Sequence, residues 1–135
     1  MHFTSIVTSF IVNDQKILLL KRSNQVKSMK CLWAGISGII EKYDKTPLSR
    51  AKIEIFEEVG IEENELKLLK SIEQLRIISP QYKNHEWNIF PFLFSTKNLV
   101  IKLNLENSEF KWVKPTEIIN YKTVPDLEKI LINLL

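Results

Sequence analysis

The sequence predicts a mixed α/β (α+β) fold, with strands on either side of a central helix and a second helix at the end. Three observations support this class: runs of β-branched and aromatic residues, one segment with helix start and stop signals, and aliphatic residues at helical spacing near the C-terminus. The chain has 135 residues, 44% of them hydrophobic and 26% charged. This is typical of a globular protein, and we expect one domain over residues 1–135.

The first part of the chain predicts a hairpin and a short strand. Phe3–Val12 is rich in Phe, Ile, Val and Thr, and Lys16–Lys21 contains four consecutive aliphatic residues, so both are typical of strands. The turn-forming sequence Asn-Asp-Gln at 13–15 predicts that the two strands pair. Leu32–Gly38 is expected to be a short strand that leads into a glycine.

The strongest local signal is a helix at Pro47–Val59. Thr46 suits the N-cap, and Pro47 suits the first helical position, which needs no N–H donor. Gly60 suits the position just past the helix, where a left-handed backbone closes it. At about 100° per residue, one face of the helix carries the aliphatic side chains expected in the core, namely Leu48, Ala51, Ile55 and Val59.

Three glutamates, Glu54, Glu57 and Glu58, lie on the arc next to this core face. Like charges three and four residues apart repel one another on a helix surface. Two interpretations are open at this point. Either the carboxylates bind a cation, or the face is solvated and water screens the charges.

The second part of the chain predicts further strands and the closing helix. Four segments are expected to be strands: Leu66–Ile78, Trp87–Ser95, Leu99–Leu105 and Phe110–Val113. A polar loop with Pro80 and His85 joins the first two, and Pro115–Ile119 is expected to form a helical turn. The last helix is predicted after Pro125 from aliphatic residues at helical spacing, namely Leu127, Ile130, Leu131, Leu134 and Leu135.

Charge and cysteine content argue against several classes of protein. A formal net charge of +3 is too small to indicate bulk nucleic-acid binding, which needs a clustered basic face. The single cysteine, Cys31, cannot form an internal disulfide. No apolar run reaches the roughly 18–20 residues of a membrane span, and the N-terminus lacks the basic start of a signal peptide. We therefore expect a cytoplasmic protein without a membrane partner.

Gly38 and the segment EIFEEVGI, Glu54–Ile61, together resemble the Nudix box, whose pattern is G-x5-E-x7-R-E-U-x-E-E-x-G-U with U an aliphatic residue. LWAGISG resembles the strand that usually enters the box, and Leu18–Arg22 resembles the second strand of the family. Glu109–Val113, followed by Pro115, is similar to its late strand and short helix. The resemblance covers nearly the whole chain and implies an α/β/α sandwich with a curved mixed sheet.

Two positions depart from the family pattern. Ile53 stands where the family has arginine. The first glutamate falls on Lys45 when counted back from the helix, or on Asp44 when counted forward from the box glycine. In the family, the arginine helps to hold the box carboxylates. Arg50 lies four residues before Glu54 on the same arc, so we hypothesise that it takes over this role. An ordinary surface arginine is the alternative.

The resemblance implies a metal-dependent hydrolase. Mg²⁺ (or Mn²⁺) takes oxygen ligands and neutralises the charge of a phosphoanhydride. By resemblance, Glu57 and Glu58 are the main metal ligands. Glu54 is either a further ligand or the group that orients the water, and the carbonyl of Ser37 or Gly38 is the backbone ligand. Gly38 is also expected to permit a tight loop beside them.

Other residues are candidates for the substrate. Arg22 resembles the strand-end arginine that contacts substrate phosphate, and arginine suits bidentate phosphate binding; a surface arginine on the hairpin is the alternative. Trp87 is a candidate for stacking on a base, with simple packing as the alternative. Glu106 or Glu109 could supply a further carboxylate, although a solvated loop explains each as well.

The expected reaction is hydrolysis of a phosphoanhydride in a nucleoside diphosphate linked to another group, a small-molecule substrate. Three alternatives stay open. The chain could be a nucleotide-binding module that has lost hydrolysis, which Ile53 favours. It could be an isomerase of the diphosphate-isoprenoid type, which would need a cysteine such as Cys31 near the site, or an RNA-directed pyrophosphohydrolase. Specificity would come from the loops Asn24–Lys30 and Ile78–Glu86, and a homodimer is also open.

Overall fold

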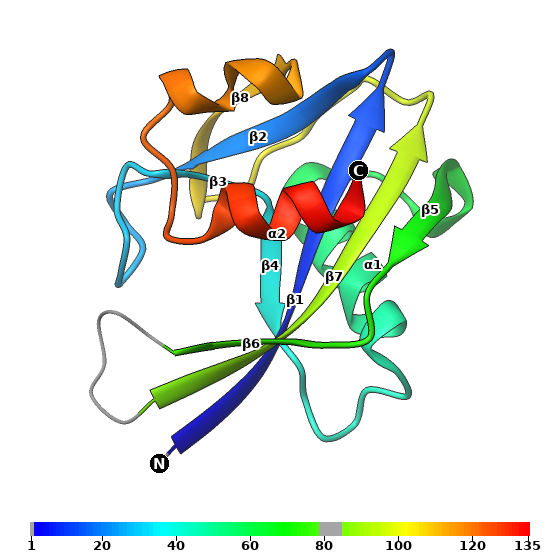
Figure 1. The fold of residues 1–135 in the computed structure, drawn as a ribbon. Helices are drawn as coiled ribbons and strands as arrows, with labels where there is room; N and C mark the ends of the chain where they lie inside the picture. The colour runs from blue at the N-terminus through cyan, green and yellow to red at the C-terminus, as the bar shows by residue number, and fades with distance from the viewer. Residues whose placement is uncertain (1, 79–84) are drawn as a thin grey trace.

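The computed structural model describes residues 2–78 and 85–135, and it confirms the mixed α/β class (Figure 1). In chain order the strands are β1 His2–Asn13, β2 Lys16–Arg22, β3 Trp33–Ala34, β4 Ile36–Ile39, β5 Leu66–Ser71, β6 Leu75–Ile78, β7 His85–Thr96 and β8 Asn107–Val113. The helices are α1 Pro47–Val59 and α2 Leu127–Leu134, with the 3₁₀ turns η1 Glu63–Glu65 and η2 Pro115–Asn120. In this part of the chain, no helix is both long and apolar enough to cross a membrane.

Strand β1 is the centre of an open, curved mixed sheet. One edge of β1 pairs in parallel with β7 over nearly its whole length. Its other edge pairs with β4 at Ile6–Ser9 and then with β2 at Val12 and Asn13, both antiparallel. Strand β8 joins the sheet on β2, while β5 and β6 join it on β7. The predicted hairpin of the first two strands is confirmed by the pairing of β1 with β2.

The predicted helix Pro47–Val59 is confirmed at both ends. The Thr46 hydroxyl accepts a hydrogen bond from the Ser49 amide at 3.0 Å, which satisfies one of the free N–H groups of the first turn. Gly60 has a φ of 77°, and its amide donates to the Phe56 carbonyl at 3.0 Å. A left-handed residue there closes the last turn, and glycine adopts this conformation without steric cost.

Two hydrophobic cores lie on the two faces of the sheet, and the strands supply them by alternation. On β2, Leu18 and Leu20 pack against α1, while Ile17 and Leu19 pack on the side of α2. The first core includes Val7, Ile11, Ala51, Ile55, Val59 and Phe94; the second includes Phe10, Trp33, Leu127, Ile130, Leu131 and Leu134. The sandwich predicted from the resemblance is therefore confirmed (Figure 1).

The prediction of a strand at Leu99–Leu105 is wrong, because this segment is an irregular connection. The side chains of Asn98 and Asn104 accept hydrogen bonds from the amides two residues further on, at Val100 and Glu106. Such bonds compete with a strand ladder. The Lys102 amide donates instead to the carbonyl of Val59 at the end of α1.

The predicted strand Leu66–Ile78 is two strands, β5 and β6, and the break lies opposite Pro91 of β7. The Ile72 amide donates to the Pro91 carbonyl at 3.1 Å, but proline has no N–H to donate in return. The ladder therefore stops there and resumes at Leu75, opposite Ile89. Pro80 and most of the predicted loop Ile78–Glu86 lie outside the described residues, whereas His85 begins β7.

Candidate active site

Glu58 is the most deeply buried acidic side chain of helix α1, which carries the box glutamates and is called the box helix below. The residue is 5% exposed, and its Oε1 accepts a hydrogen bond from Asn107 Nδ2 at 3.1 Å. Its Oε2 is buried and has no hydrogen-bond partner among the described residues. Burial raises the pKa of Glu58 to about 8, against the opposing hydrogen bond from Asn107. A buried oxygen of this kind fits a site that is completed by a cation.

Glu54 lies against β4, and its place depends on a glycine. A Cβ atom at Gly38 would overlap the side chain of Glu54. Gly38 lies inside β4, in register with Val7, and has no left-handed φ. The expectation that Gly38 permits a tight loop is therefore wrong, because the glycine is needed for space. Burial raises the pKa of Glu54, while its hydrogen bond with Arg50 opposes this shift.

Glu57 differs from the other two box glutamates because its side chain is exposed. It lines a surface groove with Lys52, Ile53 and Phe56. Its charge still reaches Glu54, whose pKa it helps to raise. No three carboxylate, imidazole or thiol side chains of the described residues stand close enough to enclose a metal ion. The structure thus brings Glu54 and Glu58 to one side of α1 and leaves Glu57 at the solvent edge.

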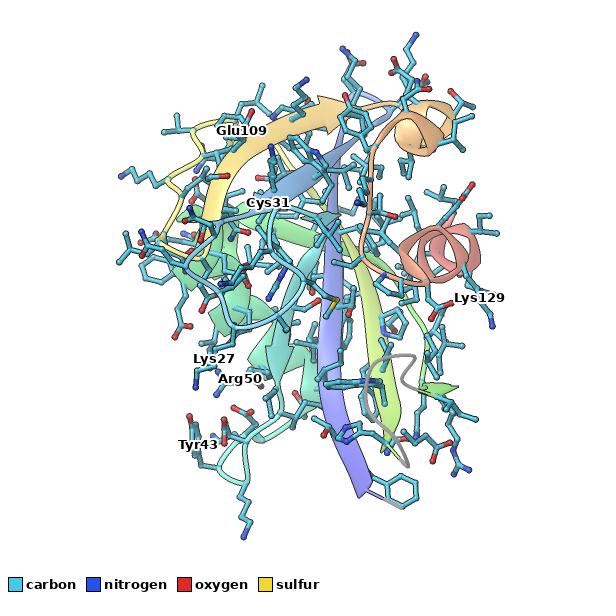
Figure 2. The ribbon with its side chains drawn as sticks, turned by 90° about the vertical axis from the view of Figure 1, so that its left-hand side faces the viewer. Lys27, Cys31, Tyr43, Arg50, Glu109 and Lys129 are labelled. Atoms are coloured by element: carbon cyan, nitrogen blue, oxygen red, sulfur yellow. The ribbon has the colours of Figure 1, made fainter. Side chains whose placement is uncertain are left out.

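The structure distinguishes Glu106 from Glu109, the two late acidic residues that the sequence offered as a further carboxylate of the site. Burial is the main cause of the raised pKa of Glu54 and of Glu58, and Glu106 is close enough for its charge to add to both shifts. Glu109 faces elsewhere and forms an exposed ion pair with Lys21 at 3.4 Å. In Figure 2, Glu109 lies well apart from Arg50 on the box helix.

Arg50 is buried, so the surface alternative for this residue is wrong. It is 6% exposed. Its Nη1 donates to Glu54 Oε2 at 2.9 Å, and its Nε and Nη2 donate to the two oxygens of Asp44 at 2.8 and 3.0 Å. Nη2 also donates to the Tyr43 hydroxyl at 3.2 Å, and the guanidinium carbon lies 5.6 Å from the centre of that ring. Figure 2 shows Arg50 and Tyr43 on the same flank of the molecule.

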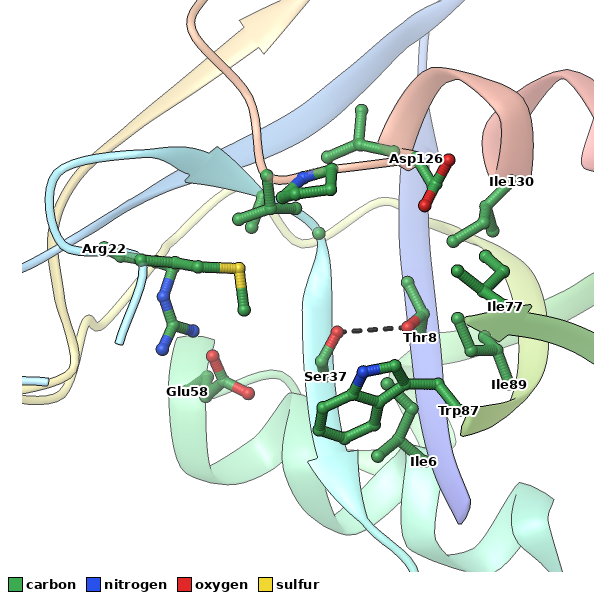
Figure 3. A pocket seen from close by; sticks show the side chains of 16 residues that line it. Ile6, Thr8, Arg22, Ser37, Glu58, Ile77, Trp87, Ile89, Asp126 and Ile130 are labelled. Carbon is green, nitrogen blue, oxygen red and sulfur yellow. Dashed lines mark hydrogen bonds between the residues drawn. The ribbon is translucent and has the colours of Figure 1, made fainter. Parts of the chain in front are cut away.

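A cavity of about 150 Å³ opens beside Glu58, between the sheet and the start of α2 (Figure 3). Arg22 lines it, and its guanidinium points toward the Glu58 carboxylate. The Nε and Nη2 atoms of Arg22 donate to the Ser28 carbonyl at 3.3 and 3.1 Å, which holds the side chain in place. The predicted phosphate-binding arginine therefore lies next to the acidic group.

Trp87 and Ser37 also line this cavity. Ser37 Oγ lies 3.1 Å from Thr8 Oγ1, and the Trp87 ring lies along the wall (Figure 3). Because β4 pairs with β1 alone among the described strands, its other edge carries backbone groups without a strand partner. The remaining walls are mostly apolar and include Ile6, Ile77, Ile89, Val124 and Ile130.

Sequence reasoning missed three residues around the site. Asn107 was missed because no motif marks a single asparagine that lies 49 positions from its partner Glu58. Tyr43 was missed because its contact with Arg50 depends on the path of the loop. Asp126, an exposed residue at the cavity, is the N-cap of α2 with a φ of 66° and makes no capping hydrogen bond with its side chain. Aspartate is a common N-cap residue, so the helix start had a sequence signal, but its place at the cavity depends on the tertiary fold.

The comparisons with known proteins agree with this fold. The family model described as "NUDIX domain" matches residues 2–134. The chain therefore belongs to the Nudix family. No curated protein matches it.

Solved structures share the fold at low sequence identity. The MutT protein from Methanosarcina mazei Go1 is 20% identical with a TM-score of 0.73, covering 98% of this chain and 92% of that one. The C. elegans Ap4A hydrolase, solved as a binary complex, is 14% identical with a TM-score of 0.72, covering 98% and 93%. The NUDIX domain of Shewanella oneidensis NrtR, complexed with ADP ribose, is 18% identical with a TM-score of 0.63, covering 98% and 84%.

Proposed function

We propose that the protein hydrolyses a phosphoanhydride bond in a nucleoside diphosphate linked to another group. The observation that carries this proposal is the buried, unpartnered Oε2 of Glu58 beside a cavity that Arg22 also lines. A carboxyl group with an unpartnered oxygen and a guanidinium at one cavity suit a phosphorylated ligand that binds together with a cation. Membership of the Nudix family supports the same reaction class.

The donor set fits a hard divalent cation. Glu58 offers an unpartnered carboxylate oxygen on the same side of α1 as Glu54, and the free edge of β4 offers the carbonyl of Ser37 or Gly38, whereas Glu57 lies at the solvent edge of the helix. Oxygen atoms of these kinds are the ligands that Mg²⁺ and Mn²⁺ take. When bound, such an ion neutralises the charge of the phosphoanhydride and makes water a better nucleophile.

Residues of the chain would bind the substrate and position the groups that react. Water attacks one phosphorus atom and gives up a proton, a new P–O bond forms as the anhydride P–O bond breaks, and the departing phosphate keeps the bonding electrons. Arg22 would bind the phosphate anion from the cavity wall. Trp87 would stack on a flat ring of the substrate, such as a base, along the apolar wall. Glu54 would either hold the cation or orient the water.

The test is a turnover screen in Mg²⁺ and then Mn²⁺. The panel contains nucleoside triphosphates, nucleotide sugars, ADP-ribose, dinucleoside polyphosphates and 5′-triphosphate RNA, so it includes the RNA-directed alternative. Glu58→Gln is the inactive variant, and Glu109→Gln is the matched control because Glu109 lies in an exposed ion pair. We expect metal-dependent turnover that Glu58→Gln abolishes and Glu109→Gln keeps. Turnover that survives in Glu58→Gln would contradict the proposal.

A nucleotide-binding module without hydrolysis is the second candidate, and Ile53 at the arginine position favours it. Nucleotide that raises the melting temperature while the whole panel stays intact would establish this candidate instead. The isomerase alternative is weakened, because Cys31 is exposed and is not among the residues that line the cavity. The homodimer stays a prediction.

A further inference from the structure

A surface groove runs along the solvent side of the box helix. Ile53 and Phe56 lie three residues apart on that side, are 40% and 54% exposed, and form the apolar part of the groove. Single exposed apolar side chains are common on protein surfaces. Two neighbouring ones in a groove with a charged rim are more typical of a surface that another chain covers.

The wall that faces the box helix across the groove is acidic. It carries Glu62 and Glu63, which belong to the segment between α1 and β5. Lys52 lies 3.8 Å from Glu63, but this ion pair is exposed and therefore weak. Glu62 has no basic partner among the described residues. The groove thus suits a segment with apolar side chains on one side and cations on the other.

Strand β5 has both features and lies at the edge of the sheet (Figure 1). Only one of its edges pairs with a described strand, which is β7. Leu68 and Leu69 are 41% and 47% exposed. Lys67 and Lys70 are also exposed, and neither forms an ion pair with any described residue.

The two faces of β5 carry different side chains. Leu68 lies opposite Phe94 of the core under α1, so it is on the face of the sheet that α1 covers. Lys70 lies opposite Leu93 of the other core, and Lys67, next to Leu68, points to that same other face. A β5 strand that enters the groove edge-on can therefore place Leu68 against the apolar wall and the two lysines against the acidic wall.

The backbone of β5 is a poor template for a further strand. Leu69 is an extra residue between Leu68 and Lys70, where the register with β7 shifts. A bulge and lysine side chains on an edge strand both disfavour a continuous ladder with another chain. Contact through side chains in a groove is therefore favoured over extension of the sheet.

We propose that the groove of each protomer binds strand β5 of a second copy of this chain, which gives a homodimer with two-fold symmetry. The groove and β5 adjoin in one protomer, because Glu63 begins the turn η1 that leads directly into Leu66. One two-fold axis between them forms the contact twice and closes the assembly at two copies. Ile53, at the position where the Nudix pattern has arginine, is part of this contact. The inference does not depend on the proposed hydrolysis.

Exchange of charges tests whether the two surfaces face one another. Glu62→Lys/Glu63→Lys reverses the acidic wall, and Lys67→Glu/Lys70→Glu reverses the strand. In a dimer of either variant alone, each contact brings like charges together. A heterodimer of the two variants has opposite charges in both contacts, so a mixture should restore what each variant has lost.

Lys27→Glu/Lys30→Glu is the matched control. It changes the net charge as much as the strand variant does, and both side chains are exposed. They belong to the loop between β2 and β3, at the opposite end of the sheet from β5. Figure 2, which views the side of the molecule away from β5, shows Lys27 on the near surface.

Sedimentation velocity over a wide range of concentrations measures the dimer, and thermal melts check that each variant folds. We expect a concentration-dependent dimer for the wild type and the control, a monomer for each of the two charge variants alone, and a dimer for their mixture. Phe56→Ala should raise the Kd of the dimer about tenfold, because aromatic side chains are prominent among those that dominate interface affinity. It replaces the groove variant if Glu62→Lys/Glu63→Lys does not fold.

Three results would overturn the inference. A wild type that stays monomeric at every concentration removes the dimer. A wild-type dimer that the strand variant and the groove variant, or Phe56→Ala in its place, both retain uses another surface. Monomeric charge variants whose mixture also stays monomeric do not face one another as proposed. Turnover is measured separately in the screen described above, so failure of this inference and failure of the proposed function are distinguishable.

Discussion

The side chain of Glu54 occupies the space that a side chain at position 38 would need, so Gly38 and Glu54 are fitted to one another. We predict that Gly38→Ala lowers kcat strongly and the melting temperature only slightly. The added methyl group would displace the Glu54 side chain, while the backbone of β4 keeps its position. Gly35→Ala is the control. Its Cβ would meet the Phe10 ring and the Ser9 carbonyl at 2.9 Å, so it should mainly lose stability. Steady-state kinetics and thermal melts check both variants.

The buried carboxyl of Glu58 predicts a pH-dependent stability for the metal-free protein. Its pKa is raised from 4.5 to about 8 in the folded state, so the folded chain keeps a proton that the unfolded chain has lost. The stabilisation is complete at low pH and disappears as the pH rises from about 4.5 to about 8. The slope is at most about 1.4 kcal/mol per pH unit.

Urea unfolding at several pH values, in the presence of a chelator, measures this effect. Glu58→Gln has no such proton, so its stability should change less over the same interval. Parallel curves for the wild type and Glu58→Gln would contradict the assignment to Glu58.

Added metal should raise the melting temperature most at a pH at which Glu58 is ionised. We predict that Mn²⁺ or Mg²⁺ raises the melting temperature of the wild type near pH 8, because a ligand that binds only the folded state stabilises it by about 2.7 kcal/mol at a hundredfold excess over Kd. Glu58→Gln should not respond, whereas Glu109→Gln should respond like the wild type. A shift of equal size in Glu58→Gln would place the bound metal elsewhere.

Trp87 provides a test of the cavity as the substrate site. We expect Trp87→Ala to raise the KM for nucleotide about tenfold, because stacking of a base on an aromatic ring contributes about 1–3 kcal/mol. Trp87→Phe should keep much of the affinity, and kcat should change little in both. An unchanged KM in Trp87→Ala would assign this side chain to packing, which is the role of Trp33 in the core.

Local signals predicted the helix α1 to the residue, because Thr46, Pro47 and Gly60 act on the neighbouring backbone. The break between β5 and β6 was not predictable in this way, because it depends on Pro91, which is distant in the sequence. The candidate site likewise combines features that local sequence predicts with features that depend on distant contacts. The helical spacing of Arg50 and Glu54 predicted their pairing. The same periodicity placed all three glutamates on one arc, so it could not distinguish the buried Glu58 from the exposed Glu57. That difference depends on what packs against the helix.

The cavity is lined both by Glu58 from α1 and by Leu127 and Ile130 from α2, although these helices cover opposite faces of the sheet. The cavity can reach both layers because β4 and β2 occupy different stretches of the same edge of β1. The groups proposed for chemistry and much of the apolar wall proposed for recognition therefore belong to separate layers. Substitutions in α2 can reshape the wall without disturbing the box helix, so the surface proposed for recognition is free to diverge while the residues proposed for hydrolysis are retained.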